Sequence, residues 1–449
     1  MSARPEWLVQ FGRRLLFARG RAGLTQQALG APNLSKSFIS LLESGRSHPS
    51  VETVISLARR VNSSIGALLL DPADLRVETV LNLLHLARQM DPDTHGADAI
   101  KLVDAASALL PDMPVELRAR AALLRARVAI GAGRLDEGAR WAEETTALAR
   151  QHRLATHLGM ALALRGEVEV RRRAYGAALP WLEEAAVILQ RSKAARTEEN
   201  VRALLSLGTT RFQLGQINRA QRAYRRALEV SARLRLSSLR GKALVGLSLV
   251  AWSRRQLDAA ATYLTQAREA FAGAEDLVEV GRTLGHLGLV RREQGKLDEA
   301  LAALEQSLRV QDRVASPRDR SMTLEEMALV LLALKRRGDA SRAARRGIRE
   351  AQAAGDPARQ AACQVALARV LRAQGRRREA IELLRGAVST LNRVGEGGRA
   401  TTAAGELGLL LREAGADAEA DKYLAMALHD RGAAGRMAAP AEVLEGLAR

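Results

Sequence analysis

GQINRAQRAYRRALEV (215–230) recurs in altered form as GKLDEALAALEQSLRV (295–310) and GRRREAIELLRGAVST (375–390). Each stretch opens with glycine and carries small residues at fixed places, with large apolar residues between them. The first small residue after the glycine recurs at intervals of 40 residues, with one interval of 42. Its occurrences are Gly138, Ala178, Ala220, Ala260, Ala300, Ala340, Ala380 and Ala420.

Two further columns of small residues keep the same period. One lies seven residues later, at Thr145, Ala185, Ala227, Ala267, Ser307, Gly347, Ala387 and Ala427. The other lies twelve residues earlier, at Ala126, Gly166, Gly208, Ser248, Gly288, Ala328, Ala368 and Gly408. Residues seven apart share one helix face, and small facing residues let two helices approach closely. The pattern predicts an all-α solenoid of about eight stacked helix hairpins, since one hairpin cannot bury its apolar face alone.

These columns resemble the tetratricopeptide repeat over residues 119–440, with a longer period than the usual ~34 residues. We expect glycine at 133, 215, 295, 375 and 415 to end helices in the left-handed conformation. Large packing residues follow the first small column by four positions, at Leu182, Tyr224, Leu264, Leu304, Leu384 and Leu424. Residues 73–118 are predicted to form a degenerate helix pair, and 441–449 a capping helix.

The first 72 residues break the period and are predicted to form a separate small domain. Four of the thirteen aromatic residues lie here, at Trp7, Phe11, Phe17 and Phe38, which indicates a core of its own. Thr25, Ser35 and Ser50 are candidate helix caps. Together with a first helix around Leu8, Phe11 and Leu15 and a last one at 65–69, they predict five short helices.

This region resembles the Cro/C1-type helix-turn-helix domain of the XRE family of regulators. The resemblance rests on GLTQ at 23–26, LSKSFIS at 34–40, Glu43 with Gly45, and the apolar end at 65–70. The turn before the third helix is one residue shorter than usual, and we expect Asn33 to take the left-handed place of its missing glycine.

The resemblance implies a role for each matching residue. Lys36 and Ser37 would enter the major groove at the front of the third helix, with Ser40 and Leu41 on the same face. Gln26 would donate to a phosphate, and Arg19 and Glu43 would form a structural ion pair. Ile39, Leu29, Leu57 and Ala58 would be core. The implied DNA-binding set is Thr25, Gln26, Gln27, Lys36, Ser37, Ser40, Leu41, Arg46 and Ser47, of which Arg46 and Ser47 would contact backbone phosphate.

A helix-turn-helix domain followed by such a solenoid resembles the peptide-sensing regulators of bacterial cell–cell signalling. Certain first-helix positions of the repeat would then face a ligand groove with cations and aromatic rings. This predicted effector groove consists of Arg202, Lys242, Arg282, Thr209, Phe212, Trp252, His286 and Arg292. Arginine is so common here that a solvated surface explains such a column equally well, and the few asparagines form no ladder to clamp a peptide backbone.

Composition narrows the function classes. The net charge is +19, and residues 1–72 carry nine basic and four acidic residues, about twice the charge density of the rest. Sixty-two of the 69 basic residues are arginine, a skew that genomic base composition can also produce. A lone cysteine, Cys363, excludes a disulfide framework. The sequence contains no nucleotide loop or metalloprotease motif, so we expect no enzyme, cofactor or metal. With no apolar run of ~18 residues or signal peptide, we expect a cytoplasmic protein without membrane contact.

These observations predict a sequence-specific, DNA-binding transcriptional regulator that acts on a double-stranded operator. Its solenoid would mediate homodimerisation and bind a peptide or protein effector. The alternative is an interaction scaffold built on the repeats, whose helix-turn-helix head only tethers it or is vestigial. Discrete binding sites on genomic DNA would favour the regulator, whereas uniform binding that follows only the salt concentration would favour the scaffold.

Overall fold

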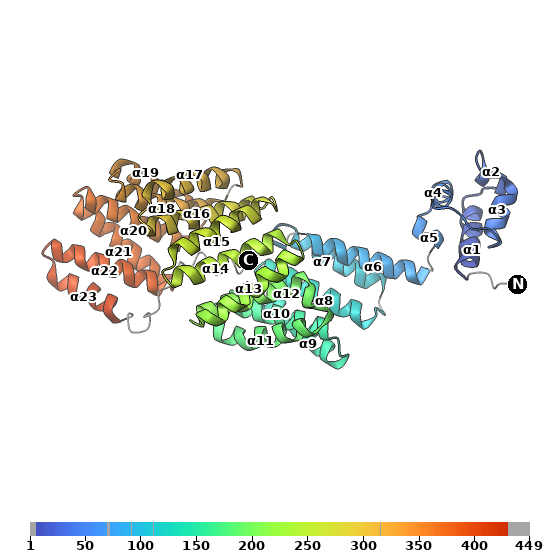
Figure 1. Cartoon of the computed structure of the whole chain (residues 1–449), viewed down its shortest axis with the longest axis horizontal. Helices are drawn as coiled ribbons and strands as arrows, with labels where there is room; N and C mark the ends of the chain where they lie inside the picture. The colour runs from blue at the N-terminus through green and yellow to red at the C-terminus, as the bar shows by residue number, and fades with distance from the viewer. Residues whose placement is uncertain (1–5, 70–71, 91, 111, 315, 430–449) are drawn as a thin grey trace. The chain divides into compact units, whose positions relative to one another are not determined.

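The computed structural model describes residues 6–69, 72–90, 92–110, 112–314 and 316–429 (Figure 1). Within these ranges the regular elements are all helices, which confirms the all-α class. The chain divides into two compact units, Met1–Arg153 and Leu154–Arg449. Across the described part, every helix is too short or too polar to cross a membrane.

The first unit begins with five helices, as the capping residues predict. They are α1 (Glu6–Arg21), α2 (Gln26–Gly30), α3 (Lys36–Glu43), α4 (Val51–Arg60) and α5 (Ile65–Leu69). Thr25, Ser35 and Ser50 cap α2, α3 and α4, and each side-chain oxygen accepts a hydrogen bond from a backbone N–H three residues later, at 3.1–3.2 Å. These bonds satisfy donors that a helix start leaves without an intrahelical partner.

The core of this five-helix head is smaller than its aromatic content indicates. Phe11, Leu15, Leu29, Ile39, Leu42 and Leu57 are fully buried in it. The predicted separate core is therefore present, and Trp7 and Phe17 lie outside it, 46% and 69% exposed. The 3.6-residue periodicity of α1 explains the difference, because its buried face is set by Leu8, Phe11 and Leu15.

The rest of the first unit consists of two helix pairs. They are α6 (Pro72–Gln89) with α7 (Pro92–Leu109), and α8 (Val115–Gly131) with α9 (Leu135–Gln151). Val80, Leu84 and Val103 are fully buried where α6 and α7 pack. In the second pair the Arg125 guanidinium lies 4.7 Å from the ring centre of Trp141, a cation–π contact. This pair is the first of the eight predicted hairpins.

The second unit contains the other seven hairpins, each made of two consecutive helices. The helices are α10 (Ala155–Arg171), α11 (Tyr175–Arg191), α12 (Glu198–Gln213), α13 (Ile217–Arg233), α14 (Ser237–Ser253), α15 (Leu257–Ala272), α16 (Leu277–Glu293), α17 (Leu297–Arg313), α18 (Pro317–Ala333), α19 (Arg337–Ala353), α20 (Pro357–Ala373), α21 (Arg377–Arg393), α22 (Gly397–Glu413) and α23 (Asp417–His429), with a 3-10 turn η1 (Lys193–Arg196) before α12. The predicted number of about eight helix hairpins is confirmed, one in the first unit and seven in the second. The predicted capping helix at 441–449 lies outside the described residues.

The small-residue columns lie where the two helices of a hairpin approach most closely. A Cβ added to Gly166 would come within 2.5 Å of Leu182, and one added to Gly288 within 2.5 Å of Leu304. The large residue of the second helix therefore fills the space that a glycine leaves on the first. At the turns, Gly133, Gly215, Gly295, Gly375 and Gly415 have φ of +72° to +80°, as predicted.

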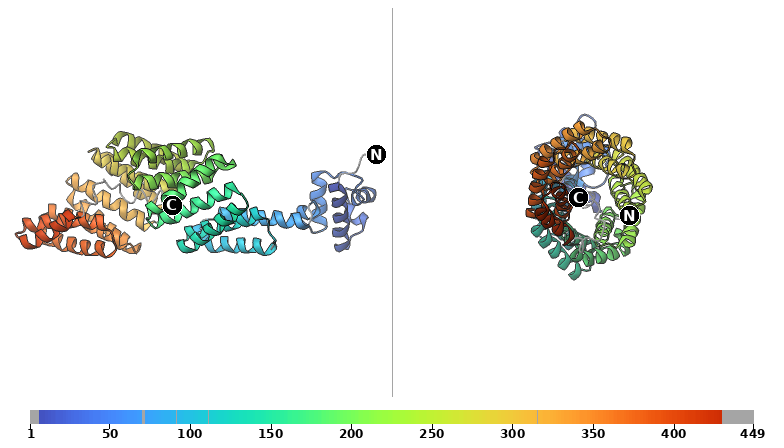
Figure 2. Two further views of the ribbon diagram at one scale, coloured as in Figure 1. Left: turned by 90° about the horizontal axis from the view of Figure 1, so that it is seen from below. Right: turned by 90° about the vertical axis from the view of Figure 1, so that its left-hand side faces the viewer.

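The hairpins of the second unit curve so far that distant repeats meet. Arg173, in the turn between α10 and α11, forms an ion pair at 3.4 Å with Glu396, which precedes α22. In the end-on view of Figure 2 the green-to-red hairpins follow one another around a common axis. The boundary between the two units falls after α9, inside the stretch 119–440, so the domain limits read from the sequence stay a prediction.

Candidate nucleic-acid interface and ligand groove

Helix α3 has one buried and one exposed face. Ile39, Leu42 and Glu43 are buried against the head core. The predicted base-reading residues Lys36, Ser37, Ser40 and Leu41 are all exposed, and their spacing places them on one side of the helix. Because Ser35 caps the helix, the front of α3 keeps a defined backbone position from which these side chains can project.

A buried carboxylate joins α1, α2 and α3. Arg19 Nε donates to Glu43 Oε1 at 2.5 Å, and its Nη2 donates to Oε2 at 3.2 Å. The structural ion pair implied by the family resemblance is therefore present. Gln26 Nε2 also donates to Glu43 Oε2, at 2.7 Å. The Gln26 amide, which we expect to contact a phosphate, is thus hydrogen-bonded to Glu43 within the head. This contact orients the start of α2.

The connection from α2 to α3 differs from the sequence expectation. Asn33 does not have a positive φ, so it does not replace a left-handed glycine, and the Ala31–Pro32 peptide is cis. Arg60 of α4 donates from Nη1 to the carbonyl of Leu29 at 2.7 Å and also to that of Ala31. Sequence reasoning missed this role of Arg60, because its two acceptors are backbone atoms about thirty residues away.

The other predicted contacts surround α3. Thr25 and Gln27 are exposed at the start of α2, although the Thr25 hydroxyl is already engaged in capping. Arg46 is exposed and Ser47 half-buried after α3. Gly12 on α1 allows α3 to approach, because a Cβ there would come within 2.5 Å of the Leu42 and Glu43 carbonyl oxygens. No sequence signal distinguished that glycine.

In the second unit, two of the three predicted groove cations share a pocket. Arg202 of α12 and Lys242 of α14 line a cavity of about 420 Å³, together with Arg235 and the first residues of α14. Glu198 pairs with Arg202 at 2.7 Å. Burial lowers the pKa of Lys242, against the attraction of Glu279. The Lys242 ammonium has no hydrogen-bond or ion-pair partner among the described residues, so its donors are available to an anion entering this pocket.

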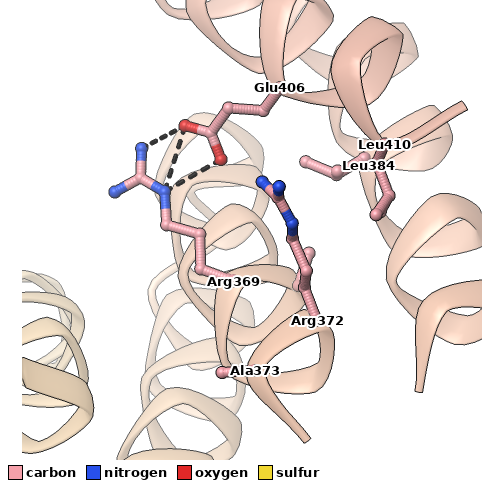
Figure 3. A pocket seen from close by; sticks show the side chains of 7 residues that line it. Arg369, Arg372, Ala373, Leu384, Glu406 and Leu410 are labelled. Carbon is pink, nitrogen blue, oxygen red and sulfur yellow. Dashed lines mark hydrogen bonds and ion pairs between the residues drawn. The ribbon is translucent and has the colours of Figure 1, made fainter. Parts of the chain in front are cut away.

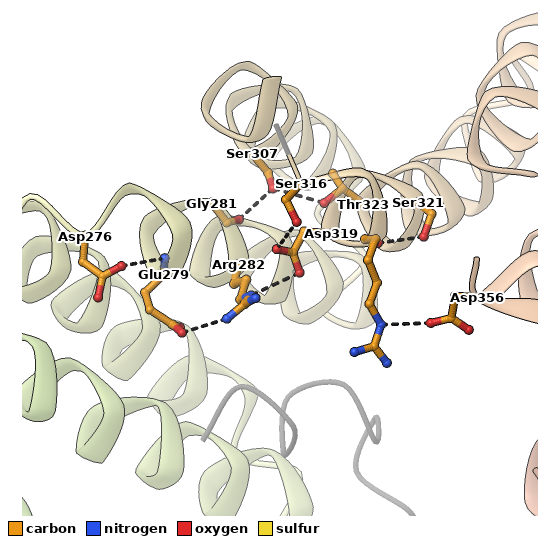
Figure 4. Close-up of polar contacts among 11 residues, drawn as sticks. Asp276, Glu279, Gly281, Arg282, Ser307, Ser316, Asp319, Ser321, Thr323 and Asp356 are labelled. Atoms are coloured by element: carbon orange, nitrogen blue, oxygen red, sulfur yellow. Dashed lines mark hydrogen bonds and ion pairs between the residues drawn. The ribbon is translucent and has the colours of Figure 1, made fainter. Parts of the chain in front are cut away.

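The third predicted cation, Arg282, is already neutralised by the protein (Figure 4). Its Nη1 donates to Glu279 at 2.9 Å and its Nε to Asp319 at 3.1 Å. Burial raises the pKa of Glu279, while Arg282 and Lys242 counteract that rise. Arg282 therefore connects α16 to α18, whereas the cations that line the pocket are Arg202, Arg235 and Lys242.

The remaining predicted groove residues are mostly used within the stack. Thr209 is buried and shares a 3.1 Å hydrogen bond with the hydroxyl of Tyr224, and Phe212 is buried beside it. Trp252 is also buried, and its Nε1 donates to Glu293 at 2.8 Å. Arg292 pairs with Glu326 at 2.9 Å, and His286 is half-buried. Thr209 and Phe212 therefore form part of the hairpin interior, because their face of α12 packs against α13.

A further pocket, of about 310 Å³, lies among α20, α21 and α22 (Figure 3). Its two arginines have partners inside the protein. Arg369 Nε lies 2.9–3.0 Å from both carboxylate oxygens of Glu406, and Arg372 pairs with Glu413. These ion pairs neutralise the pocket from α22, so it offers little to a charged ligand.

Comparison with known families agrees with this division of the chain. A helix-turn-helix family model matches residues 16–68. Tetratricopeptide-repeat models match residues 201–233, 279–353 and 360–394. No curated protein sequence matches the chain.

Solved structures share the repeat fold at low sequence identity. Aspartyl phosphate phosphatase F from Bacillus subtilis is 15% identical with a TM-score of 0.55, over 80% of this chain and 96% of its own. The apo form of RapI is 13% identical with a TM-score of 0.63, over 80% and 99%. At such identities the likeness concerns the fold alone. The family matches therefore show an XRE-type helix-turn-helix domain at residues 16–68 and tetratricopeptide repeats within residues 201–394.

Proposed function

We propose that the protein is a sequence-specific DNA-binding transcriptional regulator, in which exposed residues of α3 contact the operator. The observation that carries this proposal is the exposed row Lys36, Ser37, Ser40 and Leu41 at the capped start of a helix. A helix fits the major groove, and lysine and serine can donate to base edges there. Arg46 and Ser47 would contact phosphates, which position the domain without specifying sequence.

Replacing Lys36 by alanine is expected to abolish discrete binding sites, because the lysine carries both a base-edge donor and a charge. The measurement is sequencing of genomic fragments retained by the full-length protein. Lys101→Ala is the control, since Lys101 is also an exposed lysine of the first unit, on α7. We expect it to leave the set of sites unchanged. If the wild-type protein retains fragments without sequence preference and responds only to salt, the scaffold alternative replaces the regulator.

We further propose that the regulator is a homodimer. One such head contacts few base pairs, and two heads on half-sites about 34–36 Å apart would read one face of the duplex. The repeat stack is the part of the chain large enough to set this spacing. Light scattering of the full chain and footprinting of a retained fragment test both points.

The effector is proposed to be a peptide or protein segment with a carboxylate that reaches the Arg202–Lys242 pocket. A structure of the same fold, the Rap conjugation gene regulator of plasmid pLS20, was solved in complex with the Phr* peptide. In the present chain, a carboxylate between Arg202 and Lys242 would satisfy the unpaired ammonium and make charge-assisted hydrogen bonds.

Replacing Lys242 by methionine is therefore expected to weaken binding of peptides that have a free C-terminal carboxylate by roughly tenfold. The probe is a library of N-acetylated hexapeptides, compared as free acids and as C-terminal amides by mass-spectrometric pull-down. Lys296→Met, at an exposed lysine before α17, is the control and should retain wild-type binding. Equal capture of acids and amides would contradict a carboxylate site.

A further inference from the structure

A second pocket of the repeat unit, distinct from the Arg202–Lys242 pocket, lies between α11 and α13, with α12 beneath them. Its volume is about 560 Å³, within the size range of sites that hold small ligands or a few side chains. Its walls come from the second helices of two successive hairpins. It shares no lining residue with the pocket that contains Lys242.

The walls of this α11–α13 groove are strongly basic. Arg211 of α12 and three arginines of α13, which are Arg219, Arg222 and Arg226, line it. Glu183, which pairs with Arg211 at 2.8 Å, is the acidic residue among its lining. Arg226 pairs with Glu229 at 2.6 Å on the exposed side of α13. Cations therefore outnumber acids around the groove.

Arg219 and Arg222 differ from the other arginines of the groove. Both are exposed, and neither has a hydrogen-bond or ion-pair partner among the described residues. In the pocket of Figure 3, by contrast, both arginines are neutralised by glutamates of α22. Arg219 and Arg222 lie about one helical turn apart, so their positive charges repel each other. An anion bound between them would offset that repulsion.

Arg219 also departs from the repeat pattern. The residue just before the first small column is acidic in five of the eight hairpins, at Glu137, Glu299, Asp339, Glu379 and Glu419. Those acids lie in the first helical turn, where the helix dipole favours negative charge. Arg219 lies in the first turn of α13, and that turn contains no acidic residue. Its charge is thus unfavourable for the helix itself, so packing and helix stability do not explain it.

The floor of the groove is apolar. Leu204, Leu207, Ala186 and Ala223 line it but are almost fully buried, so the apolar side chain open to a ligand is Val187 of α11, which is 49% exposed. An apolar floor between basic walls suits an aliphatic side chain flanked by carboxylates. A phosphate backbone would match the arginines and leave Val187 uncovered, so this combination favours a polypeptide over a nucleic acid.

We propose that the α11–α13 groove binds an acidic segment of a partner protein. Carboxylates of the segment pair with Arg219 and Arg222, and one aliphatic side chain packs against the exposed Val187. This site is independent of the operator and of the effector pocket. It gives the second unit another binding surface, a basic groove that binds an acidic ligand.

The test uses the full-length protein and the fluorescent peptide acetyl-EDELEDE-amide, whose amidated end removes the C-terminal carboxylate. Binding is followed by fluorescence anisotropy. We expect Arg219→Glu and Arg222→Glu each to weaken binding by about tenfold. Because Arg219→Glu restores the usual acid of this turn, its Tm should equal or exceed that of the wild type. A loss of binding without a loss of stability separates a binding role from a structural one.

Two controls address non-specific attraction to a protein of net charge +19. Arg225→Glu makes the same charge change on α13 but lies outside the pocket lining, and it should alter affinity less than about twofold. Exchanging the central leucine of the peptide for serine should weaken binding by about tenfold. An Arg225→Glu effect as large as that of Arg219→Glu overturns the proposal, as does indifference to the leucine. Displacement of the peptide by random-sequence duplex DNA would assign the groove to nucleic acid.

Discussion

Gly208→Ala is expected to lower the free energy of unfolding of the second unit by roughly 2 kcal/mol, because the added methyl group overpacks a rigid core. The added Cβ would lie 2.6 Å from the Tyr224 ring, which is fully buried. Gly246 contacts the same ring from α14, so the tyrosine has no space into which to move. This cost exceeds the ~1 kcal/mol that alanine gains over glycine in a helix.

The urea midpoint of the helical circular-dichroism signal measures this effect. Gly386→Ala is the matched control, because Gly386 is an exposed glycine of α21 and its added Cβ would meet no described atom within 4 Å. There the helix propensity acts alone, and we expect stabilisation by about 0.5–1 kcal/mol. The two changes are chemically identical and should shift the midpoint in opposite directions. If both substitutions raise the urea midpoint, the small-residue columns do not serve to let the two helices of a hairpin approach closely.

Glu43→Ala is expected to unfold the head while the repeats stay folded. The carboxylate is almost fully buried and accepts from Arg19 and Gln26, so its removal leaves Arg19 a part-buried charge without its partner. Breaking such a pair costs about 3–5 kcal/mol. A domain of this size has a small core and little stability to spare.

Hydrogen exchange of the full-length protein checks this prediction, since the amides of α1 and α3 should lose protection while those of α12–α14 keep it. Operator binding should disappear with the protection. Glu52→Ala, at an exposed glutamate in the first turn of α4, is the control and should change neither. Lys36→Ala should lose binding and retain protection. If Glu43→Ala keeps full protection, the ion pair is not what joins α1 to α3.

Much of the fold was predictable because its signals are local. A hairpin is a contact between helices adjacent in the chain, so the small columns and the turn glycines predict it directly. The caps of the head are equally local, since each bond spans three residues. The Arg19–Glu43 pair spans 24 residues and was expected only because of the family resemblance.

The individual sites were less predictable. The column of Arg202, Lys242 and Arg282 looked uniform in the sequence, yet Arg282 is neutralised by Asp319 of the next hairpin and Lys242 is not. Thr209 lies inside its hairpin rather than in a groove, because its hydroxyl shares a hydrogen bond with that of Tyr224 on the neighbouring helix. The α11–α13 groove is lined by side chains from three helices. In the sequence, nothing distinguishes its arginines from the other arginines of a chain that contains 62 of them.

Sequence periodicity thus established the helices, the hairpins and their order, since these depend on contacts within about forty residues and on backbone capping. The tertiary structure decided which charges meet. Partners such as Arg292 with Glu326, or Arg173 with Glu396, depend on the rotation from one hairpin to the next. That rotation arises from the packing of many side chains at once, and no short stretch of sequence encodes it.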